Sequence, residues 1–122
     1  MRPLRLILPL FALAAAAVPA RSAGQTPQRT VPIRLTEYRI DVADSVKTGD
    51  VVLAVTNAGR EAHMFLIRGH RTQIRSPLIQ PGQSVNLPAR LIVGEYLLYC
   101  GVKADGQEHR KLGMERHVRV VW

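Results

Sequence analysis

The 122-residue sequence is poor in cysteine and in aromatic residues: it has one cysteine, and Phe, Trp and Tyr together make up 5% of the chain. One cysteine excludes an internal disulfide. In an oxidising compartment we therefore expect Cys100 to be buried, paired with another chain or bound to a metal. It also excludes a lipid anchor on an N-terminal cysteine. Acidic residues are scarce as well, with 9 Asp and Glu against 17 Lys and Arg. The basic residues are scattered along the chain, which argues against nucleic-acid binding.

Long apolar runs are absent except at the N-terminus, over residues 6–18, and this run is shorter than the ~20 residues of a membrane-spanning helix. Arg2 and Arg5 precede it, and residues 18–20 (Val-Pro-Ala) match a cleavage site after Ala20. We therefore predict a signal peptide over residues 1–20, export to the periplasm or the extracellular space, and no stable membrane insertion after cleavage. The alternative is an uncleaved anchor. Cleavage would leave 15 basic and 9 acidic residues, a net charge of +6 that favours acidic partners or anionic surfaces.

Residues 21–30 are small and polar, and we expect a flexible lead-in there, followed by one domain over residues 31–122. Alternation over residues 31–35, and in a shifted phase over 38–42, predicts a strand broken by a bulge or bend near Thr36-Glu37. Further strands are predicted over residues 51–56, 63–67, 84–87, 96–100 and 117–122. No segment has a helical period of useful length. Short strands with turns about every ten residues predict an all-β sandwich or barrel.

Four residues carry donor atoms that suit a transition metal. Cys100 ends a predicted strand, His109 follows nine residues later, Met114 lies five residues beyond that, and His63 begins another strand. A thiolate, an imidazole and a thioether suit copper, whereas magnesium and calcium prefer oxygen. Two histidines and one cysteine with a weak axial methionine form the blue-copper electron-transfer arrangement. His63, Cys100, His109 and Met114 are therefore the candidate metal ligands.

Each of these residues also has an ordinary structural explanation. Free cysteine is commonly a small buried apolar residue, and methionine commonly fills a core. His63 would be a satisfied core histidine, and His109 a surface loop residue among polar neighbours. The joint pattern favours a metal, because strand ends and loops converge at one end of a sandwich.

The order of the segments resembles the cupredoxins, the plastocyanin and azurin superfamily of small blue copper proteins. The resemblance covers residues 31–122. It is carried by residues 47–51 (Lys-Thr-Gly-Asp-Val), 56–59 (Thr-Asn-Ala-Gly), 80–83 (Gln-Pro-Gly-Gln), 94–96 (Gly-Glu-Tyr), 99–100 (Tyr-Cys) and 109–114 (His-Arg-Lys-Leu-Gly-Met).

The resemblance implies a Greek-key β-sandwich with one type 1 copper ion. His63, Cys100 and His109 would be equatorial ligands and Met114 the axial one. It further implies that the backbone N–H of Met64 donates to the Cys100 sulfur. Electrons would pass through the edge of His109, which is implied to reach the surface within an apolar patch.

The sequence departs from the family in one loop. Family loops usually place two to four residues between the cysteine and the second histidine, whereas eight residues, 101–108, intervene here. The extra segment 103–106 either bulges outward and leaves the site intact, or tilts His109 and changes or empties the site. The spare ligands, ranked below the four candidates, are Asp105, Glu108, His70 and His117; His117 is expected to face solvent.

The predicted function is one-electron transfer by a monomeric protein that is not an enzyme. Its partners would be redox proteins with an acidic docking surface. The alternatives are an envelope copper carrier or chaperone and a metal-free cupredoxin-like interaction module. A thiol enzyme with a Cys100–His109 pair is disfavoured because no oxyanion donors are evident. A multicopper oxidase is disfavoured because the chain has one domain and no His-x-His pair.

Overall fold

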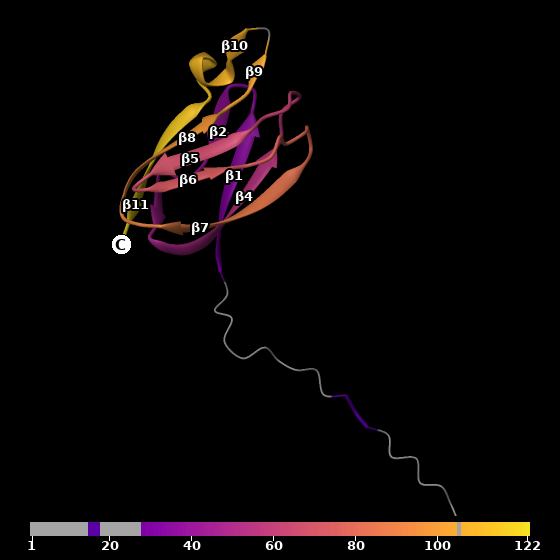
Figure 1. The fold of residues 1–122 in the computed structure, drawn as a ribbon, viewed down its shortest axis with the longest axis vertical. Coiled ribbons are helices and arrows are strands. Elements are labelled where there is room, and N and C mark those ends of the chain that lie inside the picture. Colours follow the sequence, from indigo (N-terminus) through magenta and orange to yellow (C-terminus); the bar gives the residue numbers. More distant parts are fainter. Residues whose placement is uncertain (1–14, 18–27, 105) are drawn as a thin grey trace, which may run out of the picture.

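Two β-sheets pack face to face in the computed structural model, which describes residues 15–17, 28–104 and 106–122 (Figure 1). The predicted signal peptide (1–20), apart from 15–17, and residues 21–27 of the predicted lead-in lie outside the described residues. The first sheet contains β1 (Arg29–Thr36), β2 (Arg39–Asp41), β4 (Gly49–Asn57) and β7 (Ser84–Leu91), in the order β2-β1-β4-β7. The second contains β3 (Ser45–Lys47), β5 (Phe65–Gly69), β6 (Thr72–Arg75), β8 (Gly94–Cys100) and β11 (Glu115–Val121), in the order β3-β11-β8-β5-β6.

Strand pairing in both sheets is mixed. β1 runs parallel to β4, and β3 runs parallel to β11, whereas the other pairs are antiparallel. The chain crosses from the first sheet to the second after β2, after β4 and again after β7, so each sheet is assembled from strands distant in sequence. The predicted all-β Greek-key sandwich is confirmed.

The core follows directly from the period-two alternation of the strands. In β4, Val51, Leu53 and Val55 are buried while the residues between them are partly exposed. Tyr96 and Leu98 of β8 are buried in the same way and lie in the same apolar cluster. Burying a side chain of this size stabilises the fold by about 1.5–3 kcal/mol. The two inward faces therefore form one core between the sheets.

The prediction of one strand broken by a bulge or bend near Thr36-Glu37 is wrong, because the chain reverses there and β1 and β2 form an antiparallel hairpin. Thr36 pairs with Arg39, which leaves Glu37 and Tyr38 as a two-residue turn. Tyr38 has a φ of 60°, in the left-handed region that glycine or asparagine normally occupies. Because the turn lacks both residues, its sequence did not signal a reversal of the chain.

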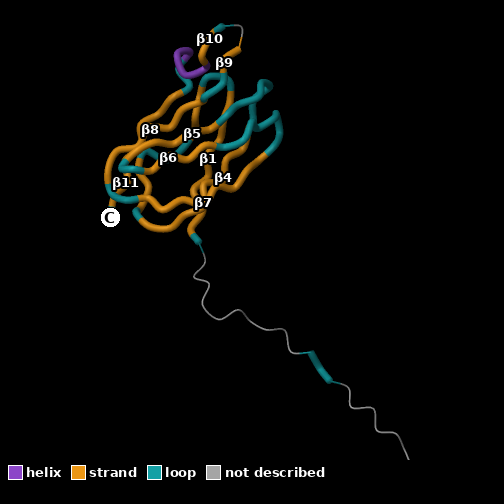
Figure 2. Tube along the Cα trace, viewed as in Figure 1, coloured by secondary structure: helices purple, strands orange, loops and turns teal. Residues whose placement is uncertain are grey.

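Other strand boundaries differ by a few residues from those predicted. β1 begins at Arg29, inside the predicted lead-in, since its first residues pair with β4. β5 begins at Phe65, and His63 instead forms a single bridge with Ile79. β7 extends to Leu91. In the part of the chain that the structure describes, the one helical segment is a 3-10 turn, η1 (His109–Leu112), coloured purple in Figure 2.

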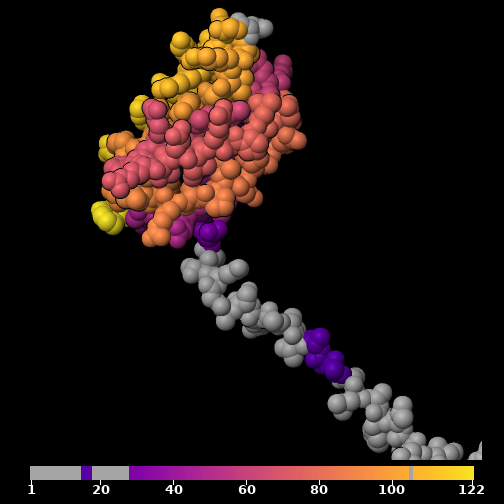
Figure 3. All heavy atoms as spheres, in the orientation of Figure 1, coloured from indigo at the N-terminus to yellow at the C-terminus, as the bar shows by residue number. Residues whose placement is uncertain are grey.

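The segment after β8 lies at one end of the sandwich. A small hairpin of β9 (Lys103–Ala104) and β10 (Gln107–Glu108) leads into η1 there, and the C-terminus lies toward the other end (Figure 1). In the space-filling view, orange and yellow atoms of this segment cover that end (Figure 3). No helix of the described residues has the length and apolarity needed to cross a membrane.

Candidate metal site

Three donor side chains meet where β8 ends. The Cys100 Sγ lies 3.8 Å from Nδ1 of His63 and 3.7 Å from Nδ1 of His109, and the two Nδ1 atoms are 3.3 Å apart. All three residues are buried, with at most 2% of their surface exposed. Within residues 28–104 and 106–122, they form the one group of three or more His, Cys, Asp or Glu residues spaced to hold a metal ion. The structure thus brings together three of the four predicted ligands through their donor atoms.

The triangle of donor atoms has the dimensions of a metal site. Bonds of about 2.05 Å to nitrogen and 2.3 Å to sulfur, directed at 120° in a plane, place two nitrogens about 3.5 Å apart and each about 3.8 Å from sulfur. The observed separations of 3.3, 3.7 and 3.8 Å lie within about 0.3 Å of these values. A set of two imidazoles and one thiolate suits a copper ion. The residues present therefore fit a type 1 copper ion.

Met114 lies beside this triangle in the backbone hydrogen-bond network. Its N–H donates to the carbonyl of His109 (3.1 Å), and its carbonyl accepts from the N–H of Cys100 (3.1 Å). Its side chain is fully buried. Gly113, which ends η1, has a φ of 105° and turns the chain from η1 into β11. Met114 is therefore placed by direct bonds to two of the other three candidate ligands.

Cys100 is buried as the last residue of β8. Burial raises the pKa of its thiol above the usual value, and hydrogen bonds from the backbone N–H groups of Met64 and Val102 oppose this increase. The Met64 N–H thus lowers the pKa of the Cys100 thiol, as the implied interaction with the sulfur would, and the Val102 N–H acts in the same direction. Two N–H donors stabilise negative charge on the sulfur, which is the form that binds a metal.

The backbone of His63 is fixed by two hydrogen bonds to Ile79. Its N–H donates to the Ile79 carbonyl (3.0 Å), and its carbonyl accepts from the Ile79 N–H (2.7 Å). Burial lowers the pKa of the His63 imidazole, and the adjacent His109 ring lowers it further. At neutral pH the ring is therefore neutral, with a lone pair available on one nitrogen.

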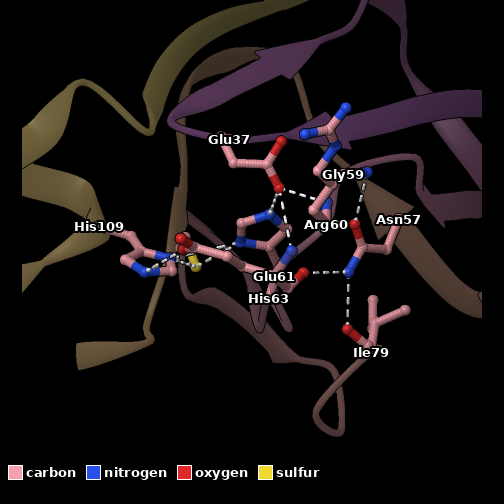
Figure 4. A network of polar contacts seen from close by, with 9 residues as sticks. Glu37, Asn57, Gly59, Arg60, Glu61, His63, Ile79 and His109 are labelled. Atoms are coloured by element: carbon pink, nitrogen blue, oxygen red, sulfur yellow. Dashed lines mark hydrogen bonds and ion pairs between the residues drawn. The ribbon is translucent and has the colours of Figure 1, made fainter. Parts of the chain in front are cut away.

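Asn57 was not predicted as part of the site, although it positions the loop that leads into His63 (Figure 4). Its fully buried side chain donates to the carbonyls of Glu61 and Ile79, both at 2.8 Å, and accepts from the N–H of Gly59 at 2.9 Å. The only sequence signal was the Asn-x-Gly turn, which indicates a turn but not its partners.

Two carboxylates, also not predicted, face the outer nitrogens of the histidines. Glu37 Oε1 lies 3.9 Å from Nε2 of His63, and Glu61 Oε2 lies 3.2 Å from Nε2 of His109. Glu37 also accepts hydrogen bonds from the N–H groups of Arg60 and Glu61, which lowers its pKa. Nothing in the local sequence distinguishes these residues, because the approach depends on loops that are distant in the chain.

The long loop between Cys100 and His109 bulges outward. The N–H of His109 donates to the carbonyl of Val102 (3.0 Å), which closes the base of the β9–β10 hairpin. The described residues of that hairpin therefore lie outside the donor triangle. Of the spare ligands, Glu108 is half-buried and pairs with Lys103 and Lys111, His70 and His117 are exposed, and Asp105 is outside the described residues.

The expectation that the edge of His109 reaches the surface is wrong. His109 is 1% exposed. The Tyr38 ring packs against it edge-on, with ring centroids 5.4 Å apart, and the Glu61 side chain covers its outer nitrogen. Tyr38 itself is 38% exposed and lies between His109 and solvent.

Comparison with solved structures identifies the fold. Over 77% of this chain, the structure superposes on 98% of the sodium-dithionite-reduced auracyanin of Roseiflexus castenholzii, with a TM-score of 0.62 and 18% identity. Auracyanin A of Chloroflexus aurantiacus, described as a blue copper protein, matches 75% of this chain over 99% of its own, with a TM-score of 0.55 and 18% identity. The fold is that of a cupredoxin. The predicted resemblance is confirmed at the level of the fold.

Larger copper enzymes contain the same fold. The blue copper oxidase of Nitrosomonas europaea matches 76% of this chain with a TM-score of 0.54 and 18% identity, but the match covers only 38% of the oxidase. No protein-family model matches the sequence, and no curated protein matches it. The comparisons therefore identify the architecture, and the function has to be inferred from the residues of the site.

Proposed function

We propose that this protein is an exported type 1 copper protein that carries single electrons. The observation that carries the proposal is the buried triangle of His63, Cys100 and His109, whose dimensions fit a metal ion. These three residues would bind the copper, and Met114 would be the weak axial ligand. When bound, copper supplies a one-electron couple between Cu(I) and Cu(II).

The chain's own contribution is to fix the donors and exclude water. Cys100 belongs to a paired strand, His63 bridges to Ile79, and His109 begins η1. Preset donors reduce the rearrangement that accompanies a change of oxidation state. All four candidate ligands are at most 2% exposed, which supports a retained redox centre over a copper-exchanging carrier.

The proposed partner is a redox protein with an acidic surface. Tyr38 contacts the His109 ring and is partly exposed, and Leu112 of η1 is 40% exposed. Arg110 and Lys111 lie in the same 3-10 turn. A small apolar contact favours a weak, rapidly dissociating complex, and the net charge of +6 that cleavage would leave favours a salt-sensitive association with an acidic protein. We further propose that the protein acts as a monomer and is not itself an enzyme.

Export is proposed from the N-terminal sequence. Residues 1–20 have the charge, apolar run and cleavage site of a signal peptide. Secretion by the native host should yield a protein that begins at Arg21, as measured by N-terminal sequencing and intact mass. A secreted chain that still begins at Met1 would contradict cleavage.

The decisive experiment is the visible and electron-spin resonance spectrum after Cu(II) is added to the purified protein. We expect an intense thiolate-to-copper absorption that Cys100→Ser abolishes and that His117→Ala, at an exposed histidine of β11, leaves unchanged. Retention of the band in Cys100→Ser would refute the proposed ligands. A copper carrier, the second candidate, would release its metal rapidly to a chelator, whereas an electron carrier should retain it.

A further inference from the structure

Each of the two histidines of the site also has a carboxylate facing its outer nitrogen, Nε2. Each ring directs Nδ1 toward the donor triangle and Nε2 toward the carboxylate (Figure 4). The separation is 3.2 Å for His109 and Glu61, and 3.9 Å for His63 and Glu37. Among the described residues, neither buried Nε2 has a hydrogen-bond partner of good geometry. The Glu61 carboxylate lies within hydrogen-bond distance of the His109 Nε2.

The backbone of Glu61 is fixed on both sides, although its side chain is 46% exposed. Its N–H donates to Glu37 Oε1 (3.0 Å), and its carbonyl accepts from the buried Asn57 amide (2.8 Å). These bonds tie the loop to the β1–β2 turn and to the end of β4. These two hydrogen bonds therefore fix the backbone from which the Glu61 side chain reaches His109.

The chemistry of imidazole gives this placement a consequence. When Nδ1 supplies a lone pair to a metal, the proton of the neutral ring is on Nε2. A carboxylate that accepts this proton in a hydrogen bond fixes the ring's tautomer and orientation and makes Nδ1 a stronger donor. A stronger nitrogen donor favours the harder, more highly charged Cu(II) over Cu(I).

We propose that Glu61 is a positioning residue that fixes the tautomer of His109 and strengthens it as a donor to Cu(II). The effect on copper rests on the proposed function, whereas the effect on the tautomer does not. Glu37 is the weaker candidate because its oxygen is 3.9 Å from His63 and already accepts two backbone N–H groups. The alternative is that Glu61 forms only an exposed ion pair, and such pairs contribute little to stability. In that case its loss would leave the copper affinity, the reduction potential and the His109 tautomer unchanged.

The test compares Glu61→Gln with Glu95→Gln. Glu95 is an exposed, ion-paired carboxylate at the opposite end of β8 from Cys100, so the control removes the same charge away from the site. Loss of a carboxylate that supports a ligand histidine typically lowers metal affinity by 10–100-fold. We expect Glu61→Gln to lower the affinity for Cu(II) about tenfold more than that for Cu(I). A tenfold difference corresponds to a reduction potential higher by about 59 mV.

The second measurement needs no copper. Long-range ¹H–¹⁵N spectra of the metal-free protein report which His109 nitrogen carries the proton. We expect the Nε2–H form in the wild type and in Glu95→Gln, and a mixture of the two tautomers in Glu61→Ala. Glu61→Asp, which retains the charge on a shorter side chain, should lie between the wild type and Glu61→Gln in potential.

The outcomes separate the two proposals. A wild-type protein that forms no type 1 site would refute the proposed function, while the tautomer experiment would still test Glu61. Equal potentials in Glu61→Gln and Glu95→Gln, or an unchanged tautomer in Glu61→Ala, would overturn the role of Glu61. If Glu61→Gln fails to fold, as judged by circular dichroism, Glu61→Asp replaces it, and a wild-type potential in that variant overturns the proposal.

Discussion

The Nδ1 atoms of His63 and His109 lie 3.3 Å apart, although 46 positions separate the two residues in the chain. Both atoms also face the Cys100 sulfur. Three groups that carry lone pairs are thus buried together and face one another. Such an arrangement gains most from a shared cation, which bonds to all three groups at once.

Copper should therefore stabilise the folded protein. A ligand that binds only the folded state at a free concentration 1,000 times its Kd adds about 4 kcal/mol. We expect Cu(II) to raise the Tm of the wild type and of His117→Ala in differential scanning calorimetry. His63→Ala should lose most of this increase because one corner of the triangle is missing. An equal increase in His63→Ala would place the copper elsewhere.

Asn57→Ala should destabilise the protein through the loop that leads into His63. The substitution removes three hydrogen bonds from a fully buried amide, at about 1 kcal/mol each. We expect a loss of about 3 kcal/mol in urea unfolding. Thr56→Ala, which removes a single exposed bond to Ser84, is the matched control and should cost less than about 1 kcal/mol. Equal losses in the two variants would show that the Asn57 side chain does not brace this loop.

The β9–β10 hairpin should be dispensable for the site. The His109 N–H already donates to the Val102 carbonyl, and the same bond would flank a two-residue turn between these residues. An Asn-Gly turn can therefore replace residues 103–108. We expect the shortened protein to bind Cu(II) with the wild-type absorption spectrum, because the described hairpin residues lie outside the donor triangle. Loss of the absorption in a folded variant would mean that the hairpin helps to place His109.

The metal-free protein should be most stable between about pH 6.5 and pH 8.5, the usual pKa values of histidine and cysteine. The pKa of His63 is lowered in the folded state, so below about pH 6.5 the unfolded chain binds more protons and stability falls. The pKa of Cys100 is raised, so above about pH 8.5 the unfolded thiol ionises first and stability falls again.

Urea unfolding across this pH range measures the effect. His63→Gln should flatten the acid side of the profile and Cys100→Ser the alkaline side, each without changing the other. An acid side that is as steep in His63→Gln as in the wild type would assign the loss of stability to other groups.

The strands were largely predictable, because alternation such as Val51, Leu53 and Val55 is a local property that burial on one face imposes. The hairpin at Glu37 and Tyr38 was not. Its two-residue turn lacks the glycine or asparagine that usually marks a reversal, and Tyr38 adopts the left-handed conformation only because pairing of β1 with β2 requires it.

The donors followed from residue type: one thiol, two of four imidazoles and one thioether suffice to suggest copper. By itself the sequence determined the all-β class and this inventory of ligands, since periodicity and side-chain chemistry belong to each short segment. Only the tertiary structure decided that Asn57 holds the loop before His63, that Glu37 and Glu61 face the outer nitrogens of the two histidines, and that Tyr38 covers His109. The physical reason is that hydrogen bonds and ring contacts act over a few ångströms, and folding sets those separations between loops far apart in the chain.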